Sequence, residues 1–261
     1  MIGAIIGDII GSVYEWDNIR TKDFPLWKET CRFTDDTVMT CAVYQALKKY
    51  LEGEKQEALP DLLVKEMKTL GRCYPHCGYG QRFAKWLFSD ERTPYYSFGN
   101  GAAMRVSAAG FLAESRQEAM EYAAASARVT HDHPEGVKGA VAVALGIFLG
   151  REGKSRQQIR KALSAYYPLD FTLDEIRGSY DFDVSCQGSV PQAITAFLEA
   201  EDFEDAIRGA ISIGGDSDTI AAIAGSLAQS CFGVPETMRT RALSYLDDRL
   251  KAIVLEAAQW E

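Results

Sequence analysis

Ala and Gly are concentrated in the apolar stretches of this sequence, most clearly over residues 123–129, 137–149 and 221–227. Side chains this small allow neighbouring helices to pack closely. Alternating apolar and polar strand patterns are scarce, and no Asn-Gly or Asp-Gly hairpin turn lies between candidate strands. The sequence therefore predicts one compact all-α domain over residues 1–261, built from a dozen or so helices.

Capping residues, prolines and glycines mark several helix boundaries. Thr34 precedes a predicted helix over residues 36–49, and Asp132-His133-Pro134 places a capping residue and a proline at another helix start. Gly214-Gly215 ends one predicted helix, and Asp216-Ser217 opens the next. The later part of the chain predicts four helices, over residues 191–199, 202–213, 217–232 and 235–250.

The acidic net charge of the chain limits the classes of ligand that it is expected to bind. The formal net charge is −9, whereas nonspecific nucleic-acid binding needs a basic surface that displaces counterions. Nucleic acid is therefore expected only as a modified substrate. An anionic ligand remains compatible with this charge if metals, helix N-termini or a few basic residues hold it locally.

Other features of the sequence favour a cytoplasmic location. The apolar start lacks a cationic leader and carries Asp8 and Glu15, and no apolar run reaches the roughly 18 residues of a membrane span. The six scattered cysteines are expected to be reduced thiols. Cys73, His76 and Cys77 lie close together, but no second ligand pair has the spacing of a structural zinc site.

Two aspartate-rich motifs dominate the candidate chemistry. The first is Thr34-Asp35-Asp36-Thr37, and the second is Gly214-Gly215-Asp216-Ser217-Asp218-Thr219. Each motif alone is explained by capping, because Asp and Thr stabilise helix N-termini. Together they supply four carboxylates and two hydroxyls, hard oxygen donors that select Mg²⁺, Mn²⁺ or Ca²⁺. Four carboxylates suit two ions better than one, which predicts a dinuclear site.

A third motif lies in the apolar first helix, from Gly7-Asp8 to Glu15. The seven-residue spacing of the two acids places them near one helical face, and Ile5, Ile9 and Ile10 are expected to face the core. An exposed polar stripe would explain the acids. Gly7 and Gly11 on neighbouring turns suggest instead that another element packs closely there.

Two further segments carry candidate ligand-binding groups. The Gly99-Asn100-Gly101 turn leads into a small-residue helix and offers free backbone N–H groups to an anion such as a diphosphate. Tyr95, Tyr96 and Phe98 precede it and are interpreted either as stacking groups for a base or as core. In Thr130-His131-Asp132-His133, the His-x-His spacing resembles a metal-binding pair, but the other motifs offer only oxygen ligands. We therefore interpret His131 as a hydrogen-bonding group in the cleft and His133 as a helix-start residue.

In this order, the motifs resemble those of the ADP-ribosylglycohydrolase family. The resemblance covers nearly the whole chain, and the pairing of Thr-Asp-Asp-Thr with Gly-Gly-Asp-x-Asp-Thr is its most specific part. The other matching residues are Gly7-Asp8, Glu15, Phe33, Tyr74-Pro75, Gly78-Tyr79-Gly80, Trp86, Gly99 to Arg105, Thr130-His131 and His133-Pro134.

The resemblance implies an all-α domain with a cleft that holds two Mg²⁺ or Mn²⁺ ions and binds ADP-ribose or an ADP-ribosylated substrate. The family's catalytic glutamate falls on Glu15, and its phosphate-binding loop falls on residues 99–101. Asp35 is predicted to join Glu15 in catalysis, and His131 to join the loop in binding. The implied metal ligands are Thr34, Asp35, Asp36, Asp216, Asp218 and Thr219.

The implied reaction is hydrolysis of the glycosidic bond at C1″ of the distal ribose, with Glu15 protonating the leaving group or activating water. The acceptor is left open among arginine, serine, a nucleic-acid base and a small molecule. Arg105 is interpreted either as a phosphate ligand or as part of a structural ion pair. The alternative functions are a non-catalytic ADP-ribose-binding or structural protein on the same fold, and a two-metal phosphohydrolase acting on a nucleotide.

Overall fold

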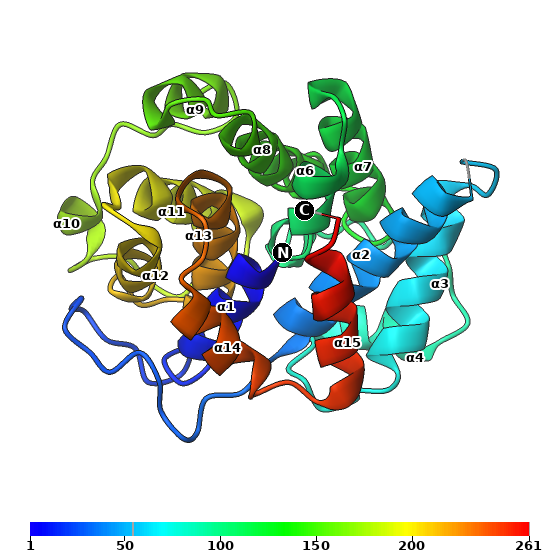
Figure 1. Cartoon of the computed structure of the whole chain (residues 1–261), viewed down its shortest axis with the longest axis horizontal. Coiled ribbons are helices and arrows are strands. Elements are labelled where there is room, and N and C mark those ends of the chain that lie inside the picture. Colours follow the sequence, from blue (N-terminus) through cyan, green and yellow to red (C-terminus); the bar gives the residue numbers. More distant parts are fainter. Residues whose placement is uncertain (54, 261) are drawn as a thin grey trace.

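The computed structural model describes residues 1–53 and 55–260, and within them the chain is helical, as the sequence predicts (Figure 1). No strand pairing beyond one isolated bridge, Gly99 with Ser185, occurs in these residues. The helices, in chain order, are α1 Ile2–Gly11, α2 Asp35–Glu52, α3 Leu59–Gly71, α4 Gln81–Phe88, α5 Gly101–Met104, α6 Ser107–Leu112, α7 Arg116–Arg128, α8 Pro134–Arg151, α9 Arg156–Leu163, α10 Leu173–Ile176, α11 Cys186–Glu199, α12 Phe203–Ile211, α13 Ser217–Phe232, α14 Glu236–Leu243 and α15 Asp248–Ala257.

The first helix packs against α13 near the centre of the molecule (Figure 1). All ten residues of α1 are buried, including Ile5, Ile9 and Ile10 as predicted. A Cβ atom added to Gly7 would lie 2.1 Å from the carbonyl oxygen of Ala221, and one added to Gly11 would lie 2.4 Å from the Cα of Asp218. The two helices are therefore in backbone contact, which only glycine permits, and the predicted close packing is confirmed.

Other helices surround this central pair. Helix α13 also contacts α8, α11 and α12, while α2 packs on α3 and α7 packs on α8. Figure 1 shows α2 and α3 on one side of the centre, α11 and α12 on the other, and α6 to α9 along the top edge. No helix in the described residues is both long and apolar enough to cross a membrane.

Three predicted boundaries are wrong. The first helix ends at Gly11, so Glu15 lies beyond it and shares no helical face with Asp8. Helix α11 begins at Cys186 and includes Pro191, which the sequence placed at the helix start. The predicted helix over residues 235–250 is two helices, α14 and α15, with a break between Leu243 and Asp248 where Asp247 caps the second helix.

Candidate metal centre and cleft

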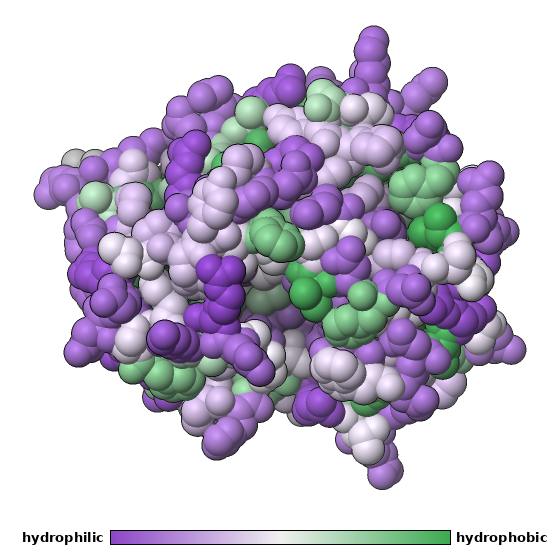
Figure 2. Space-filling view, turned by 180° about the vertical axis from the view of Figure 1, so that it is seen from behind, coloured by the Kyte–Doolittle hydropathy of each residue, from purple (hydrophilic) through white to green (hydrophobic). Residues whose placement is uncertain are grey.

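A cleft of about 620 Å³ opens where the end of α1 and the starts of α2 and α13 meet. Its volume lies in the range of small-ligand sites. The face of the molecule in Figure 2 is mostly hydrophilic, and it is hollowed near its centre beside a group of hydrophobic side chains. All predicted site residues line this cleft: Glu15, Thr34, Asp35, Asp36, Gly99, Asn100, Gly101, His131, Asp216, Asp218 and Thr219.

Asp8 fixes the start of α2 within this cleft. Its fully buried carboxylate accepts hydrogen bonds from the backbone N–H of Thr34 at 2.9 Å and of Thr37 at 3.1 Å, and from both threonine hydroxyls. These N–H groups belong to the first turn of a helix, where they lack intrahelical partners. Asp8 is therefore an internal cap that aligns the Thr-Asp-Asp-Thr motif, and the exposed-stripe interpretation is wrong.

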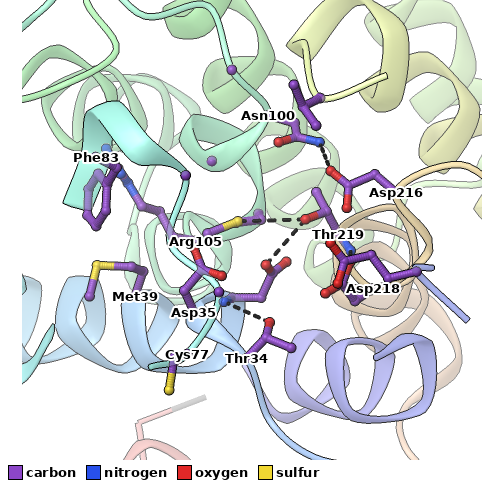
Figure 3. A pocket seen from close by; sticks show the side chains of 18 of the residues that line it. Thr34, Asp35, Met39, Cys77, Phe83, Asn100, Arg105, Asp216, Asp218 and Thr219 are labelled. Atoms are coloured by element: carbon purple, nitrogen blue, oxygen red, sulfur yellow. Dashed lines mark hydrogen bonds between the residues drawn. The ribbon is translucent and has the colours of Figure 1, made fainter. Parts of the chain in front are cut away.

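The second motif faces the first across the cleft (Figure 3). Gly214 and Gly215 have φ values of 70° and 76°, a left-handed turn that favours glycine. The turn delivers the side chains at the start of α13 to the cleft, where the Thr219 hydroxyl donates to Asp36 Oδ2 at 3.2 Å. Asn100 donates to Asp216 Oδ2 at 2.7 Å.

One fully buried oxygen of this cluster has no hydrogen-bond partner among the described residues. Asp36 is 3% exposed, and its Oδ1 atom has no hydrogen-bond donor among the described residues. A buried carboxylate oxygen without a donor is costly, and native structures normally provide a partner for it. The orphaned oxygen therefore suits a cation that the cluster would bind.

Asp35 is held by the loop that follows α3. Its backbone N–H donates to the carbonyl oxygen of Cys77 at 2.9 Å. A Cβ atom added to Gly78 would lie 3.1 Å from Asp35 Oδ1, and the φ of Gly78 is 105°. Glycine at this position thus lets the loop approach the carboxylate closely.

Burial raises the pKa of each aspartate in the cluster. The pKa values of Asp36 and Asp218 lie well above their ordinary value, first because both groups are desolvated and then because neighbouring carboxylates repel them. Asp35 shifts in the same direction for the same reasons. Burial raises the pKa of Asp216 to about 6, against the opposing hydrogen bond from Asn100. The site thus concentrates negative charge that a divalent cation would offset.

Glu15 follows α1 in a turn and reaches the same cluster. One ligand atom each of Glu15, Asp216 and Asp218 lies within 4.8 Å of the others. Burial, followed by the charge of Asp218, raises the pKa of Glu15 to about 7, while Arg32 opposes the shift. A carboxyl group with this pKa can give or accept a proton near neutral pH.

Asn18 ties the Glu15 turn to the second motif, and sequence reasoning missed it. Its side-chain amide accepts from Gly215 N–H at 2.7 Å and donates to the carbonyl oxygens of Gly215, Tyr14 and Glu15 at 2.6 to 3.0 Å. Because its partner is 197 residues away, no local pattern signals this role. Arg32 and Arg82 line the cleft and were also missed, since single arginines carry no distinctive spacing.

The structure also places the predicted helix cap His133, the aromatic residues before the Gly99–Gly101 loop, and Asn100. His133 caps α8 by accepting from Glu135 N–H at 3.1 Å, as predicted. Tyr95 lines the cleft, whereas Tyr96 and Phe98 are exposed and pack their rings on His133, so neither belongs to the core. The side-chain amide of Asn100 donates hydrogen bonds to Asp216 and Ser189.

Comparisons with known proteins agree with this geometry. The chain is 26% identical over 322 residues to the ADP-ribosylhydrolase ARH3 of Xenopus tropicalis, covering 95% of this chain and 91% of that protein. It is 29% identical over 145 residues to the ADP-ribosyl-[dinitrogen reductase] glycohydrolase of Rhodospirillum rubrum, covering 53% and 47%. A solved structure titled ADP-ribosylglycohydrolase-related protein complex superposes with a TM-score of 0.67 at 21% identity, covering 97% of this chain and 93% of that one.

The family model described as ADP-ribosylglycohydrolase matches residues 1–259, nearly the whole chain. The all-α fold agrees with that of the solved structure. Glu15 and two aspartates of the second motif form an acidic cluster that could hold a metal ion. The chain therefore belongs to the ADP-ribosylglycohydrolase family.

Proposed function

We propose that this chain is a metal-dependent hydrolase that cleaves the glycosidic bond at C1″ of ADP-ribose and releases ADP-ribose from a modified protein or small molecule. The convergence of two aspartate motifs and Glu15 in one cleft carries the proposal. Family membership supports it, as do the names of the similar ADP-ribosylhydrolases.

The donor set fits two Mg²⁺ or Mn²⁺ ions. The two aspartate motifs bring carboxylate and hydroxyl oxygens to the cleft, and these hard donors suit such cations. The orphaned Asp36 oxygen and the raised aspartate pKa values both indicate a cluster with uncompensated charge. When bound, the ions would supply positive charge that orients the ribose hydroxyls. Their ligands would be drawn from Thr34, Asp35, Asp36, Asp216, Asp218 and Thr219.

The protein's own contribution centres on Glu15. In its neutral form it can donate a proton to the atom that leaves C1″, and in its charged form it can accept one from water. Water adds its hydroxyl to C1″ and the leaving atom ends protonated, so the step balances as a hydrolysis. The buried aspartates place negative charge beside the positive charge that develops at the sugar carbon in glycosidase transition states. We assign Asp35 to this electrostatic role and to metal binding.

The acceptor can be identified by product analysis. Peptides ADP-ribosylated on arginine or on serine, and acetylated ADP-ribose, are incubated with the protein plus Mg²⁺ or Mn²⁺, and products are identified by mass spectrometry. We expect free ADP-ribose from at least one substrate, loss of the activity with a chelator, and recovery when metal is restored. AMP with ribose phosphate would indicate a phosphohydrolase instead. ADP-ribose binding without turnover on any substrate would indicate a binding protein.

A matched pair of variants tests the metal ligands. Asp218→Asn should cut turnover by at least about tenfold and weaken Mg²⁺ binding, because losing one ligand charge costs more than about 1.4 kcal/mol. Asp23→Asn, an exposed aspartate outside the cleft, should match the unmodified protein. Wild-type kinetics in Asp218→Asn would show that the motif is only a cap.

A further inference from the structure

Arg105 is a fully buried guanidinium with no ion-pair partner in the described part of the chain. The side chain lies beside Phe83 in Figure 3, with the guanidinium 5.9 Å from that ring. It donates to the carbonyl oxygen of Ser126 at 2.6 Å and to the hydroxyl oxygen of Thr130 at 2.8 Å. Arg105 therefore forms no ion pair among the described residues, and although it lines the cleft its side chain is fully buried, so the charge has another role to explain.

The hydrogen bond to Thr130 fixes where the neighbouring protons lie. A guanidinium can only donate, so the Thr130 oxygen accepts from Arg105. The hydroxyl proton must then point elsewhere, and the other polar atom in reach among the described residues is His131 Nδ1 at 2.7 Å. Thr130 is fully buried, so water does not compete for this proton. His131 Nδ1 is thus the acceptor, and the ring proton lies on Nε2.

The Nε2 atom of His131 faces the Gly99-Asn100-Gly101 loop. Cβ atoms added to Gly101 and Gly99 would lie 3.2 and 3.5 Å from it. His131 lines the cleft, is 5% exposed, and has no protein partner for Nε2 among the described residues. Burial, with the charges of Arg105 and Arg82, lowers its pKa well below the ordinary value, so the ring stays neutral. A nearly buried N–H donor without a partner therefore points at the loop.

We propose that Arg105 is a positioning residue that acts through Thr130 to hold His131 in one neutral tautomer, with its Nε2–H donating into the cleft beside the Gly99–Gly101 loop. The group that it meets is an oxygen acceptor of the ligand, and the diphosphate of an ADP-ribosyl group has that chemistry. The identity of this ligand rests on the proposed function, whereas the tautomer does not. A charged His131 would add a second donor at Nδ1 that clashes with the hydroxyl proton.

The tautomer is measured directly by ¹⁵N NMR of the imidazole rings. The chain has three histidines, which makes assignment by single substitution practical. In the unmodified protein we expect a protonated Nε2 and an unprotonated Nδ1 on His131, unchanged from about pH 5.5 to 8. A protonated Nδ1 would overturn the proposal, whatever the enzyme's activity. His133, which caps α8, serves as the internal reference.

Three substitutions then separate positioning from simple packing. Thr130→Val should move the His131 Nδ1 resonance and weaken ADP-ribose binding about tenfold, as expected for loss of one buried hydrogen bond worth about 1.4 kcal/mol. Thr130→Ser keeps the hydroxyl and should restore both. In Arg105→Lys, a single ammonium group cannot donate to both Ser126 and Thr130 as the planar guanidinium does. The Thr130 hydroxyl is then less firmly oriented, and part of the His131 population should carry its proton on Nδ1. An unchanged tautomer in folded Arg105→Lys would make Arg105 merely structural.

ADP-ribose itself is the probe for the contact. On binding, the Nε2–H resonance of His131 should shift and its exchange with water should slow. An unperturbed Nε2–H in the bound protein would show that this donor does not meet the ligand. The spectrum of the free protein does not depend on turnover. An inactive protein with the expected tautomer would therefore refute the hydrolase proposal and leave the role of Arg105 in positioning His131 unaffected.

Discussion

Single side chains in this cleft show how neutral hydrogen-bond donors hold several acidic groups in place. Among the described residues, the aspartates of the site accept hydrogen bonds from neutral donors, such as Thr37 to Asp8 and Asn100 to Asp216. Neutral donors orient a carboxylate but leave its charge in place. The arrangement therefore keeps the geometry of the site while preserving its attraction for divalent cations.

Glu15 provides the sharpest residue-scale prediction. Glu15→Gln should lower kcat about 10² to 10⁴-fold, the usual contribution of general acid–base catalysis, while ADP-ribose affinity changes little. The amide keeps the size of the group and removes its titration. Turnover assays and calorimetric ADP-ribose titration on the same sample separate the two effects. Asp17→Asn, an exposed acid two residues away and outside the cleft, is the control. Unchanged turnover in Glu15→Gln would remove it from catalysis.

At this scale, the sequence locates groups that form repeated local patterns. The two aspartate motifs are recognisable because each occurs at a helix start and because both occur in one chain. The roles of Asp8 and Asn18 are not, since each depends on partners that only folding brings close. Asp8 forms hydrogen bonds with Thr34 and Thr37, which lie 26 and 29 positions further along the chain, and Asn18 forms one with Gly215.

At the scale of elements, the contact of α1 with α13 controls the distance between the halves of the site. Gly11→Ala would force a methyl group against the Asp218 backbone, where only 2.4 Å is available. We expect a loss of about 1–3 kcal/mol in the free energy of unfolding, together with weaker Mg²⁺ binding, because the start of α13 must shift.

Substitutions at two other glycines serve as controls for Gly11→Ala. Gly7→Ala lies one helical turn further from the site and should cost similar stability with a smaller loss of Mg²⁺ affinity. Gly178→Ala has no atom within 4 Å of its added Cβ and should change neither. Thermal melts and metal titrations give both quantities. Equal metal affinity in Gly11→Ala and in the unmodified protein would show that the site tolerates movement of α1.

Helix identities were predictable where caps and periodicity agree, as for α13, which spans Ser217–Phe232 as predicted. They failed where several local signals compete for the same helix start. Pro191 is typical of a helix start but lies inside α11, because Ser185, six residues earlier, caps the helix by accepting from Gly188 N–H. The break between α14 and α15 was missed because Asp247 is only one of many acids that could serve as a cap.

For the whole molecule, the raised carboxyl pKa values predict a stability that falls as pH rises. In the metal-free protein, Asp216 has a pKa of about 6 and Glu15 of about 7, above those of an unfolded chain. The folded state thus holds more protons than the unfolded state between about pH 4 and 7, so its stability is highest below this window and is lost across it. Melting temperature measured with a chelator should decline over this range.

Both Mg²⁺ binding and the Asp218→Asn substitution should reduce the dependence of the melting temperature on pH. Saturating Mg²⁺ offsets the charge and should raise the melting temperature most near neutral pH, where the carboxylates are ionised. Asp218→Asn removes one of the repelling charges and should reduce the decline in the metal-free protein. A pH-independent melting temperature with chelator present would contradict the charged-cluster description.

The pairing of α1 with α13 also has a consequence for synthesis on the ribosome. Helix α1 is wholly buried, and its partner begins about 200 residues later in the chain. At roughly 5–20 residues per second, its isoleucines wait on the order of 10–40 seconds for the surface that covers them. During that interval the nascent chain presents the apolar surface of α1 without its α13 partner, and chaperones shield surfaces of this kind from association with other chains.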